Sequence, residues 1–191
     1  CVADGQAITH AQYAARAASL AAGLADAGLA AGDRVAILAH NGQAYVDLIG
    51  AAARLGAIVV PINWRLSAEE VAYVLSDTTP KLLIVAPDMQ PLVAGAELAG
   101  VRKYTTGPGA DAGMGWSALA SLYLERAAPT PAAIADDAGL LIVHTAAVGG
   151  RPRGALLSHR GLLAAATKSV HAWNLTSADV QVGVLPLFHL A

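Results

Sequence analysis

The residues whose types and spacing indicate chemistry are concentrated in one loop, AAVGGRPRG, which follows the apolar stretch GLLIVHT. Gly149, Gly150 and Gly154 free the backbone to turn with its N–H groups pointing inward. Arg151 and Arg153 place two permanent cations beside them, and this combination suits an anion such as phosphate. From the local composition alone, an exposed β-turn with two hydrated arginines is the simpler interpretation, because short motifs often match by chance.

The loop is not a Walker-type phosphate loop. Gly149 and Gly154 have the right separation, but Ala155 and Leu156 stand where that loop requires a lysine and a magnesium-binding hydroxyl. The stretch ALLS that follows is consistent with a strand returning along GLLIVHT. The loop would then join two neighbouring strands.

Ser158 and His159 are adjacent, and a serine beside a histidine raises the possibility of a hydrolase. No G-x-S-x-G turn surrounds the serine, and adjacent residues on a helix do not face each other. Ser158 is instead predicted to cap the helix HRGLLAAATKSVHAW.

The rest of the chain alternates helix and strand signals that would position this loop. Thr9 with Gln12, and Ser67 with Glu70, form two capping boxes. They predict helices over AQYAARAASLAAGLADAG, ending at Gly28, and over AEEVAYVLSD.

A third helix, GQAYVDLIGAAARLG, is predicted to be capped by Asn41 and closed by Gly56. The stretches DRVAILA, AIVVPI and KLLIVA are short buried strands, and the same rhythm continues weakly through the strand VRKYTT and the helix WSALASLYLER. Strands alternating with helices at this pitch predict an α/β fold with a largely parallel sheet flanked by helices. The glycine- and proline-rich stretches TTGPGADAGMG and AAPTPAAIADDAG are predicted surface connections, and the second places a subdomain joint near residues 128–138.

Composition excludes several classes of function. A net charge of −2 provides no basic field for nucleic acid, and the single cysteine leaves neither an internal disulfide nor a paired Cys/His metal site, as in a reducing cytoplasm. The sequence shows no signal-peptide pattern, and the most apolar window, LIGAAARLGAIVVPI, is interrupted by Arg54 and too short to span a membrane. We therefore expect a cytoplasmic protein without a membrane span. The high mean hydropathy of +0.50 suggests apolar surface meant for a neighbour, and the chain has the character of an excised piece.

The stretch from Gly28 to Val85 closely resembles the N-terminal region of adenylate-forming acyl-CoA synthetases, the family of fatty-acid–CoA ligases, 4-coumarate–CoA ligases and luciferases. GDRVAIL and GAIVVPINWRLSAEEVAYVLSD carry the resemblance, which runs from about the first helix to the last residue. The family phosphate loop reads T-S-G-T-T-G-x-P-K-G. Its counterparts here are Thr145, Ala146, Ala147, Val148, Gly149, Gly150, Arg151, Pro152, Arg153 and Gly154. The end LPLFHLA is similar to the family's next motif, with His189 in the histidine position.

The resemblance implies an enzyme that uses ATP with magnesium to convert a carboxylic acid to an acyl adenylate, and then passes the acyl group to coenzyme A. It implies that Thr145–Gly154 hold the β- and γ-phosphates and that His189 lies by the acyl pocket, although a histidine in an apolar run is as often structural. His144 stands where the family usually has an aromatic residue, so packing is its expected role. The family's later motifs and its C-terminal domain with the catalytic lysine would lie beyond Ala191, so we assign no catalytic residue and expect residues 1–191, a partial N-terminal domain, to be inactive alone.

The loop departs from the family pattern where chemistry depends on it. Ala146, Val148 and Gly149 replace hydroxyl residues, and Arg153 replaces the lysine. Each lost hydroxyl–phosphate contact costs on the order of 1.5–3 kcal/mol, which backbone amides and two arginines offset in part. We favour a working variant loop. Three alternatives remain open: a ligase with another acceptor, an adenylation domain of the non-ribosomal-peptide type, and a non-catalytic regulatory paralogue that binds nucleotide or acyl ligand.

Overall fold

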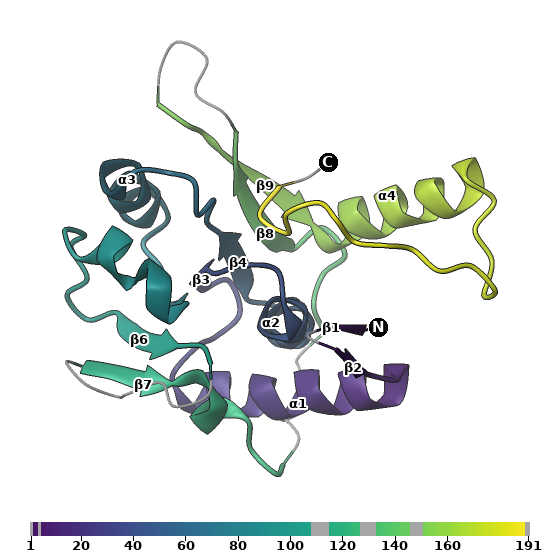
Figure 1. The fold of residues 1–191 in the computed structure, drawn as a ribbon, viewed down its shortest axis with the longest axis horizontal. Helices are drawn as coiled ribbons and strands as arrows, with labels where there is room; N and C mark the ends of the chain where they lie inside the picture. The colour runs from purple at the N-terminus through teal and green to yellow at the C-terminus, as the bar shows by residue number, and fades with distance from the viewer. Residues whose placement is uncertain (1, 4, 108–114, 127–132, 146–150, 190–191) are drawn as a thin grey trace.

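The computed structural model describes residues 2–3, 5–107, 115–126, 133–145 and 151–189. Within these residues, a seven-stranded sheet has the order β7-β6-β5-β3-β4-β8-β9 (Figure 1). Its strands are β3 (Arg34–Leu38), β4 (Ile58–Pro61), β5 (Leu82–Val85), β6 (Arg102–Thr105), β7 (Trp116–Ala118), β8 (Gly139–His144) and β9 (Gly154–Ser158). Neighbouring strands from β7 to β8 are parallel, and β9 is antiparallel to β8. The predicted α/β fold with a largely parallel sheet is confirmed.

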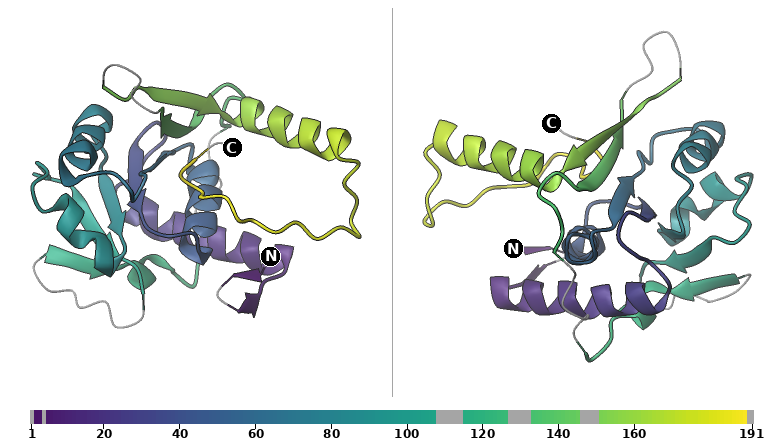
Figure 2. Two further views of the ribbon diagram at one scale, coloured as in Figure 1. Left: turned by 45° about the horizontal axis from the view of Figure 1, so that its top comes forward. Right: turned by 180° about the vertical axis from the view of Figure 1, so that it is seen from behind.

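Helices cover both faces of this sheet. Helices α1 (His10–Asp26) and α2 (Gln43–Leu55) pack on each other along one face. Helix α3 (Ala68–Thr78) and a 3-10 helix (Pro87–Val93) lie on the other face (Figures 1 and 2). A small hairpin of β1 (Val2–Ala3) and β2 (Gln6–Ala7) precedes α1. Because β3, β4 and β5 are covered on both sides, they read as nearly continuous apolar runs.

The predicted helix ends are largely confirmed. The Thr9 and Ser67 side chains both form capping boxes, and Gly56 closes α2 in the left-handed conformation with φ of 69°. Gly28 follows α1 with φ of 84°. At these positions the sequence signal and the local geometry agree, because each cap involves residues three or four apart.

The predicted cap of α2 by Asn41 is wrong. Gly42 is the N-cap, without a side-chain hydrogen bond. The Asn41 amide instead donates to the Leu185 carbonyl at 2.8 Å and accepts from the Leu187 N–H at 2.8 Å. Two bonds to the backbone of the C-terminal segment satisfy the amide more fully than one cap bond would, and they hold that segment near the end of β3.

The predicted helix WSALASLYLER is also wrong. Residues Trp116–Ala118 form β7 at the sheet edge, and only Leu119–Leu122 form a 3-10 helix. Leu119 and Leu122 are both buried, and their spacing of three matches a 3-10 turn. The backbone of Leu122 approaches α1 at Gly23 so closely that a Cβ there would collide with the Leu122 carbonyl. Packing on α1 therefore decides the local structure.

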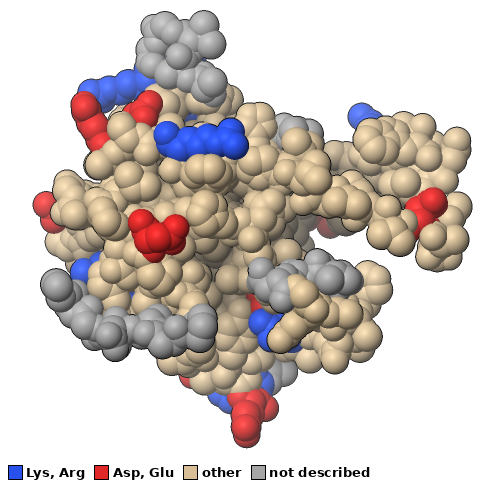
Figure 3. Space-filling model, viewed as in Figure 1, with Lys and Arg blue, Asp and Glu red and all other residues tan. Residues whose placement is uncertain are grey.

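Helix α4 (His159–Ala172) follows β9 and projects away from the sheet, and the chain then returns toward β8 (Figures 1 and 2). No residue of α4 is buried. Figure 3 shows that the projecting part, formed by α4 and the chain after it, carries few charged side chains on the visible face. Large exposed apolar side chains in and after α4 include Leu163, Val170, Trp173, Val180, Val182, Val184 and Leu185.

No helix in the described part of the chain is long and apolar enough to cross a membrane. The joint expected near residues 128–138 stays a prediction, because residues 127–132 lie outside the described residues.

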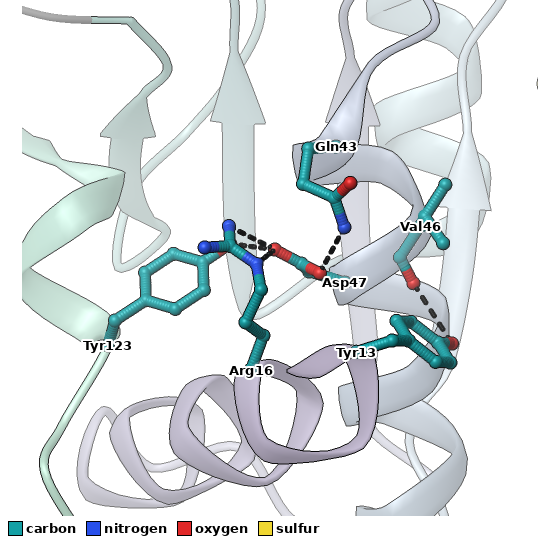
Figure 4. A network of polar contacts seen from close by, with 6 residues as sticks. All are labelled: Tyr13, Arg16, Gln43, Val46, Asp47 and Tyr123. Carbon is teal, nitrogen blue, oxygen red and sulfur yellow. Dashed lines mark hydrogen bonds and ion pairs between the residues drawn. The ribbon is translucent and has the colours of Figure 1, made fainter. Parts of the chain in front are cut away.

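A buried carboxylate holds α1, α2 and the segment after β7 together (Figure 4). Asp47 of α2 is fully buried, and its Oδ2 accepts from Arg16 at 2.6 and 3.0 Å and from the Tyr123 hydroxyl at 2.8 Å. Its Oδ1 accepts from Gln43 at 2.6 Å. Donors from three elements thus satisfy one charge, which fixes the relative position of those elements.

We expect Arg16→Ala to destabilise the protein, because it leaves the Asp47 carboxylate buried without its cation. The Arg16 side chain is 42% exposed, so the loss should be about 2 kcal/mol, below the roughly 3–5 kcal/mol for a fully buried pair. Urea denaturation measures it. Arg126→Ala, which removes an exposed pair with Asp26, is the control and should change stability little. Equal effects of the two substitutions would contradict the role of Asp47.

Stability should also fall in alkaline solution. Burial raises the pKa of the Tyr45 hydroxyl, and burial together with the Asp47 carboxylate raises the pKa of Tyr123. Unfolded tyrosine ionises near pH ~10 while these folded residues stay neutral, so their stabilisation is complete below that pH and is lost as pH rises toward the folded pKa values. The urea midpoint of unfolding should decline less steeply with rising pH in Tyr45→Phe than in the parent protein. An unchanged slope in that variant would overturn this assignment.

The exposed apolar face of α4 and residues 180–187 should cause residues 1–191, prepared alone, to self-associate. Burial of apolar surface yields about 25 cal/mol per Å², so a few hundred Å² drives association strongly. Sedimentation should detect dimers or larger species that Leu163→Glu and Trp173→Glu weaken. Ser76→Glu, an exposed substitution on α3, should have no such effect. A strict monomer at high concentration would show that this face does not associate.

Candidate functional site

The candidate site lies at the edge of the sheet where β4 and β8 end. Parallel strands carry their carboxyl ends to the same edge, where open α/β sheets bind ligands. A cavity of about 290 Å³ opens there between α3, the two arms of the β8–β9 hairpin and the C-terminal segment. Its lining residues are Pro61, Ile62, Asn63, Leu66, Glu70, Val74, His144, Thr145, Pro152, Phe188 and His189.

The two strands predicted on either side of the phosphate loop pair as expected. His144 is opposite Gly154, and the next residues extend the hairpin, since the Thr145 N–H donates to the Arg153 carbonyl at 3.0 Å. Gly154 stands in an ordinary strand rather than in a turn. A Cβ on it would lie 2.8 Å from Cγ2 of Ile142, so its small size serves packing. Ser158 caps α4 as predicted, accepting from the Gly161 N–H at 3.1 Å.

Of the predicted loop residues, Ala146, Ala147, Val148, Gly149 and Gly150 lie outside the described residues. Their assignment to a phosphate therefore remains a prediction, as does that of the other loop positions.

The second arm of the hairpin is described from Arg151 onward. The Arg151 guanidinium lies 5.3 Å from the centre of the Tyr73 ring, and the Pro152 carbonyl accepts from the Tyr73 hydroxyl at 3.1 Å. Arg153 is exposed. Within the described residues, neither arginine has a carboxylate partner. Both permanent charges are thus available to an anion.

The first arm ends at His144, whose Nε2 lies 3.0 Å from the Asp77 carboxylate of α3. The His144 side chain is only 8% exposed, which agrees with the packing role expected for it. Its Nδ1 is buried and has no hydrogen-bond partner among the described residues. The ring therefore joins α3 on one side and presents a polar atom without a partner on the other.

His189 lines the cavity. Its place beside an acyl pocket, which the resemblance implies, stays a prediction. Its side chain is exposed, and its neighbour Phe188 is buried against Trp64, with ring centres 6.2 Å apart. Trp64 in turn meets the His40 ring edge-on at 4.9 Å. These contacts, with those of Asn41, return the C-terminal segment to the sheet edge.

Several residues of the site were not identified from the sequence. Asn41, Trp64, Tyr73 and Asp77 contact the hairpin or the C-terminal segment from far away in the chain. A usable signal existed only for Asn41 and Trp64. Each lies three residues after a buried strand and so belongs to the ligand-binding edge of a parallel sheet. Tyr73 and Asp77 read as ordinary surface positions of a helix.

The comparisons with known proteins agree with this arrangement. The sequence profile described as AMP-binding enzyme matches residues 1–191, the whole of the chain. The chain belongs to the AMP-binding enzyme family.

This AMP-binding chain is similar to the long-chain-fatty-acid–CoA ligase FadD13 of Mycobacterium tuberculosis, with 34% identity over 186 residues. That alignment covers 96% of this chain and 36% of the ligase. A crystal structure assigned as a long-chain-fatty-acid CoA ligase of Rhodopseudomonas palustris superposes with a TM-score of 0.89 at 42% identity, covering 97% of this chain and 47% of that one. The ATP-bound crystal structure of MatB from the same species superposes at 0.83 and 30% identity, covering 97% and 36%.

This AMP-binding chain therefore spans about a third of the length of the curated relatives that it matches. The matched part includes the whole described sheet and both arms of the hairpin. Within the described residues, no group of three or more His, Cys, Asp or Glu side chains is placed to hold a metal ion.

Proposed function

We propose that residues 1–191 are part of a longer ATP-dependent acyl-CoA synthetase, which activates a carboxylic acid as an acyl adenylate and transfers the acyl group to coenzyme A. The observation that carries the proposal is the cavity, which brings Thr145 and Pro152 of the hairpin together with His189 of the second motif. Membership of the AMP-binding family and the names of the relatives agree with it. We further propose that the enzyme works in the cytoplasm and that residues 1–191 alone complete neither half-reaction.

In this proposal, the loop from Thr145 to Gly154 holds the β- and γ-phosphates of ATP while the acid attacks the α-phosphate. Arg151 and Arg153 supply permanent charge, and each guanidinium offers several N–H donors to phosphate oxygens. This charge offsets in part the hydroxyls missing at Ala146, Val148 and Gly149. Magnesium would enter with the nucleotide phosphates, as it usually does where proteins bind ATP.

His189 is proposed to lie beside the acid. Its side chain is exposed at the cavity, while Phe188 anchors the segment in the apolar contact with Trp64. Because Phe188 is anchored and the His189 imidazole is exposed, His189 can change rotamer as the acyl group enters while the backbone of the segment stays in place. The chain length or aromatic character of the acid would be set by groups beyond this part of the pocket.

A second candidate function is a non-catalytic paralogue that binds nucleotide or acyl ligand for regulation. The missing loop hydroxyls at Ala146 and Val148 favour it. Pyrophosphate release by the complete protein, measured with ATP, magnesium, coenzyme A and a panel of fatty and aryl acids, separates the two. Release with at least one acid supports the synthetase, whereas nucleotide binding without release supports the regulatory paralogue.

We expect Arg153→Ala to impair the use of ATP more than that of the acid, because the lost charge faces phosphate. In the complete enzyme, the KM for ATP should rise about 10-fold or more, the range for a hydrogen bond to a charged group, while the KM for the acid changes little. Arg153→Lys, which restores the family residue, should recover most of the activity.

Arg102→Ala provides the control, because it removes an exposed arginine at the opposite end of the sheet from the hairpin. It should leave both KM values unchanged. Parental kinetics in Arg153→Ala would exclude a phosphate role for this arginine.

A further inference from the structure

Helix α3 contacts both arms of the phosphate-loop hairpin through two residues, Tyr73 and Asp77. They are four positions apart, so they lie one above the other on the same face of the helix. Tyr73 contacts the second arm, and Asp77 contacts the first arm. One face of α3 therefore contacts both arms of the hairpin at the base of the loop.

The contacts on the two arms differ in kind. On the second arm, the Tyr73 hydroxyl donates to the Pro152 carbonyl at 3.1 Å, and the Tyr73 ring supports the Arg151 guanidinium at 5.3 Å. On the first arm, the Asp77 carboxylate lies 3.0 Å from Nε2 of the buried His144. A cation–π contact leaves the guanidinium its charge and its N–H donors, so the Tyr73 ring orients Arg151 without neutralising it.

Helix α3 is firmly held on its other side. Val71, Val74, Leu75 and Thr78 are buried against the sheet and the 3-10 helix that follows β5. The two arms are also joined to each other by the bond from the Thr145 N–H to the Arg153 carbonyl. The arms, the helix and this bond form a closed ring of contacts around the base of the loop.

We propose that Tyr73 and Asp77 are positioning residues, which fix the separation of the two loop arms and present Arg151 to the nucleotide phosphates. This inference rests on the proposed function, because it assigns the anion at the loop to ATP. Neither residue touches the reacting atoms. Each acts through the arm that it holds, by keeping the phosphate site formed before ATP arrives.

The Tyr73 contacts are separated by two substitutions in the complete enzyme. Tyr73→Phe removes the bond to Pro152 and keeps the ring under Arg151, whereas Tyr73→Leu removes both. We expect the KM for ATP to rise about 2- to 10-fold in Tyr73→Phe, the range for one hydrogen bond, and further in Tyr73→Leu. The KM values for the acid and coenzyme A should stay unchanged.

Tyr13→Phe is the matched control. The Tyr13 hydroxyl also donates to a backbone carbonyl, that of Val46, at 3.3 Å, and it is also partly buried, but it lies between α1 and α2. Its loss should leave the KM for ATP at the parental value. An equal rise in both tyrosine variants would overturn the proposal, because it would then reflect general loosening.

The Asp77 contact is tested by Asp77→Ala and Asp77→Asn. The asparagine amide oxygen can still accept a hydrogen bond from the Nε2–H of His144, so asparagine should restore most of the ATP affinity that alanine loses. Asp88→Ala removes another carboxylate next to a histidine, His40, at 3.5 Å on the surface, and should have no effect on ATP. Failure of asparagine to restore what alanine loses would argue against a positioning contact.

Hydrogen exchange of the Thr145 amide provides a readout that does not require turnover. Exchange should be faster in Tyr73→Leu and Asp77→Ala than in the parent and the two controls, because the bond to Arg153 closes the ring of contacts. If no acid supports pyrophosphate release, the proposed function fails, and ATP binding by calorimetry together with this exchange still decides the inference. Parental exchange, or faster exchange with parental ATP affinity, would overturn it.

Discussion

The parallel pairing of β8 with β4 is the contact on which the position of the candidate site depends. After β4 the chain forms β5, β6 and β7 on the far side of β3, and β8 then returns to pair beside β4. Because the two strands run in the same direction, Thr145 leaves the sheet beside Pro61 and Ile62. A hairpin attached to an outer edge such as β7 would have no fixed relation to α3 or to the C-terminal segment.

This one pairing brings three distant parts of the chain together. Asn41, at the end of β3, binds the backbone of Leu185 and Leu187, and Trp64, after β4, packs on Phe188. Each contact lies at the carboxyl edge, where the loops of a parallel sheet meet. Helix α4, which has no buried residue, leads the chain away from the sheet. The contacts of Asn41 and Trp64 then hold the C-terminal segment at the site. Its position therefore depends on a few polar and aromatic contacts rather than on a core of its own.

The sequence allowed the elements to be predicted where their signals are local. The Thr9 and Ser67 capping boxes, Gly56 and the buried strands all involve residues close in sequence, and they were found as expected. The Asn41 cap and the helix over WSALASLYLER were wrong because partners far along the chain, Leu185 and Gly23, decide those conformations. The family resemblance located Thr145 and His189, and the structure places both at one cavity. Tyr73 and Asp77 could not be found, because a helix pattern does not say which surface meets a hairpin folded later in the chain.

Under the proposed function, the relative size of two effects decides how tightly a loop with fewer hydroxyls can bind phosphate. A lost hydroxyl–phosphate contact costs on the order of 1.5–3 kcal/mol, whereas orienting one arginine in advance saves about 0.5–1.5 kcal/mol of ordering entropy. The Tyr73 ring under Arg151 therefore offsets only part of one missing hydroxyl. In the proposed site, the remaining affinity would come from the charges of Arg151 and Arg153 and from backbone N–H groups. In the proposed site, the contacts of Tyr73 and Asp77 with the two arms would therefore contribute more to binding than they would where loop hydroxyls hold the phosphates directly.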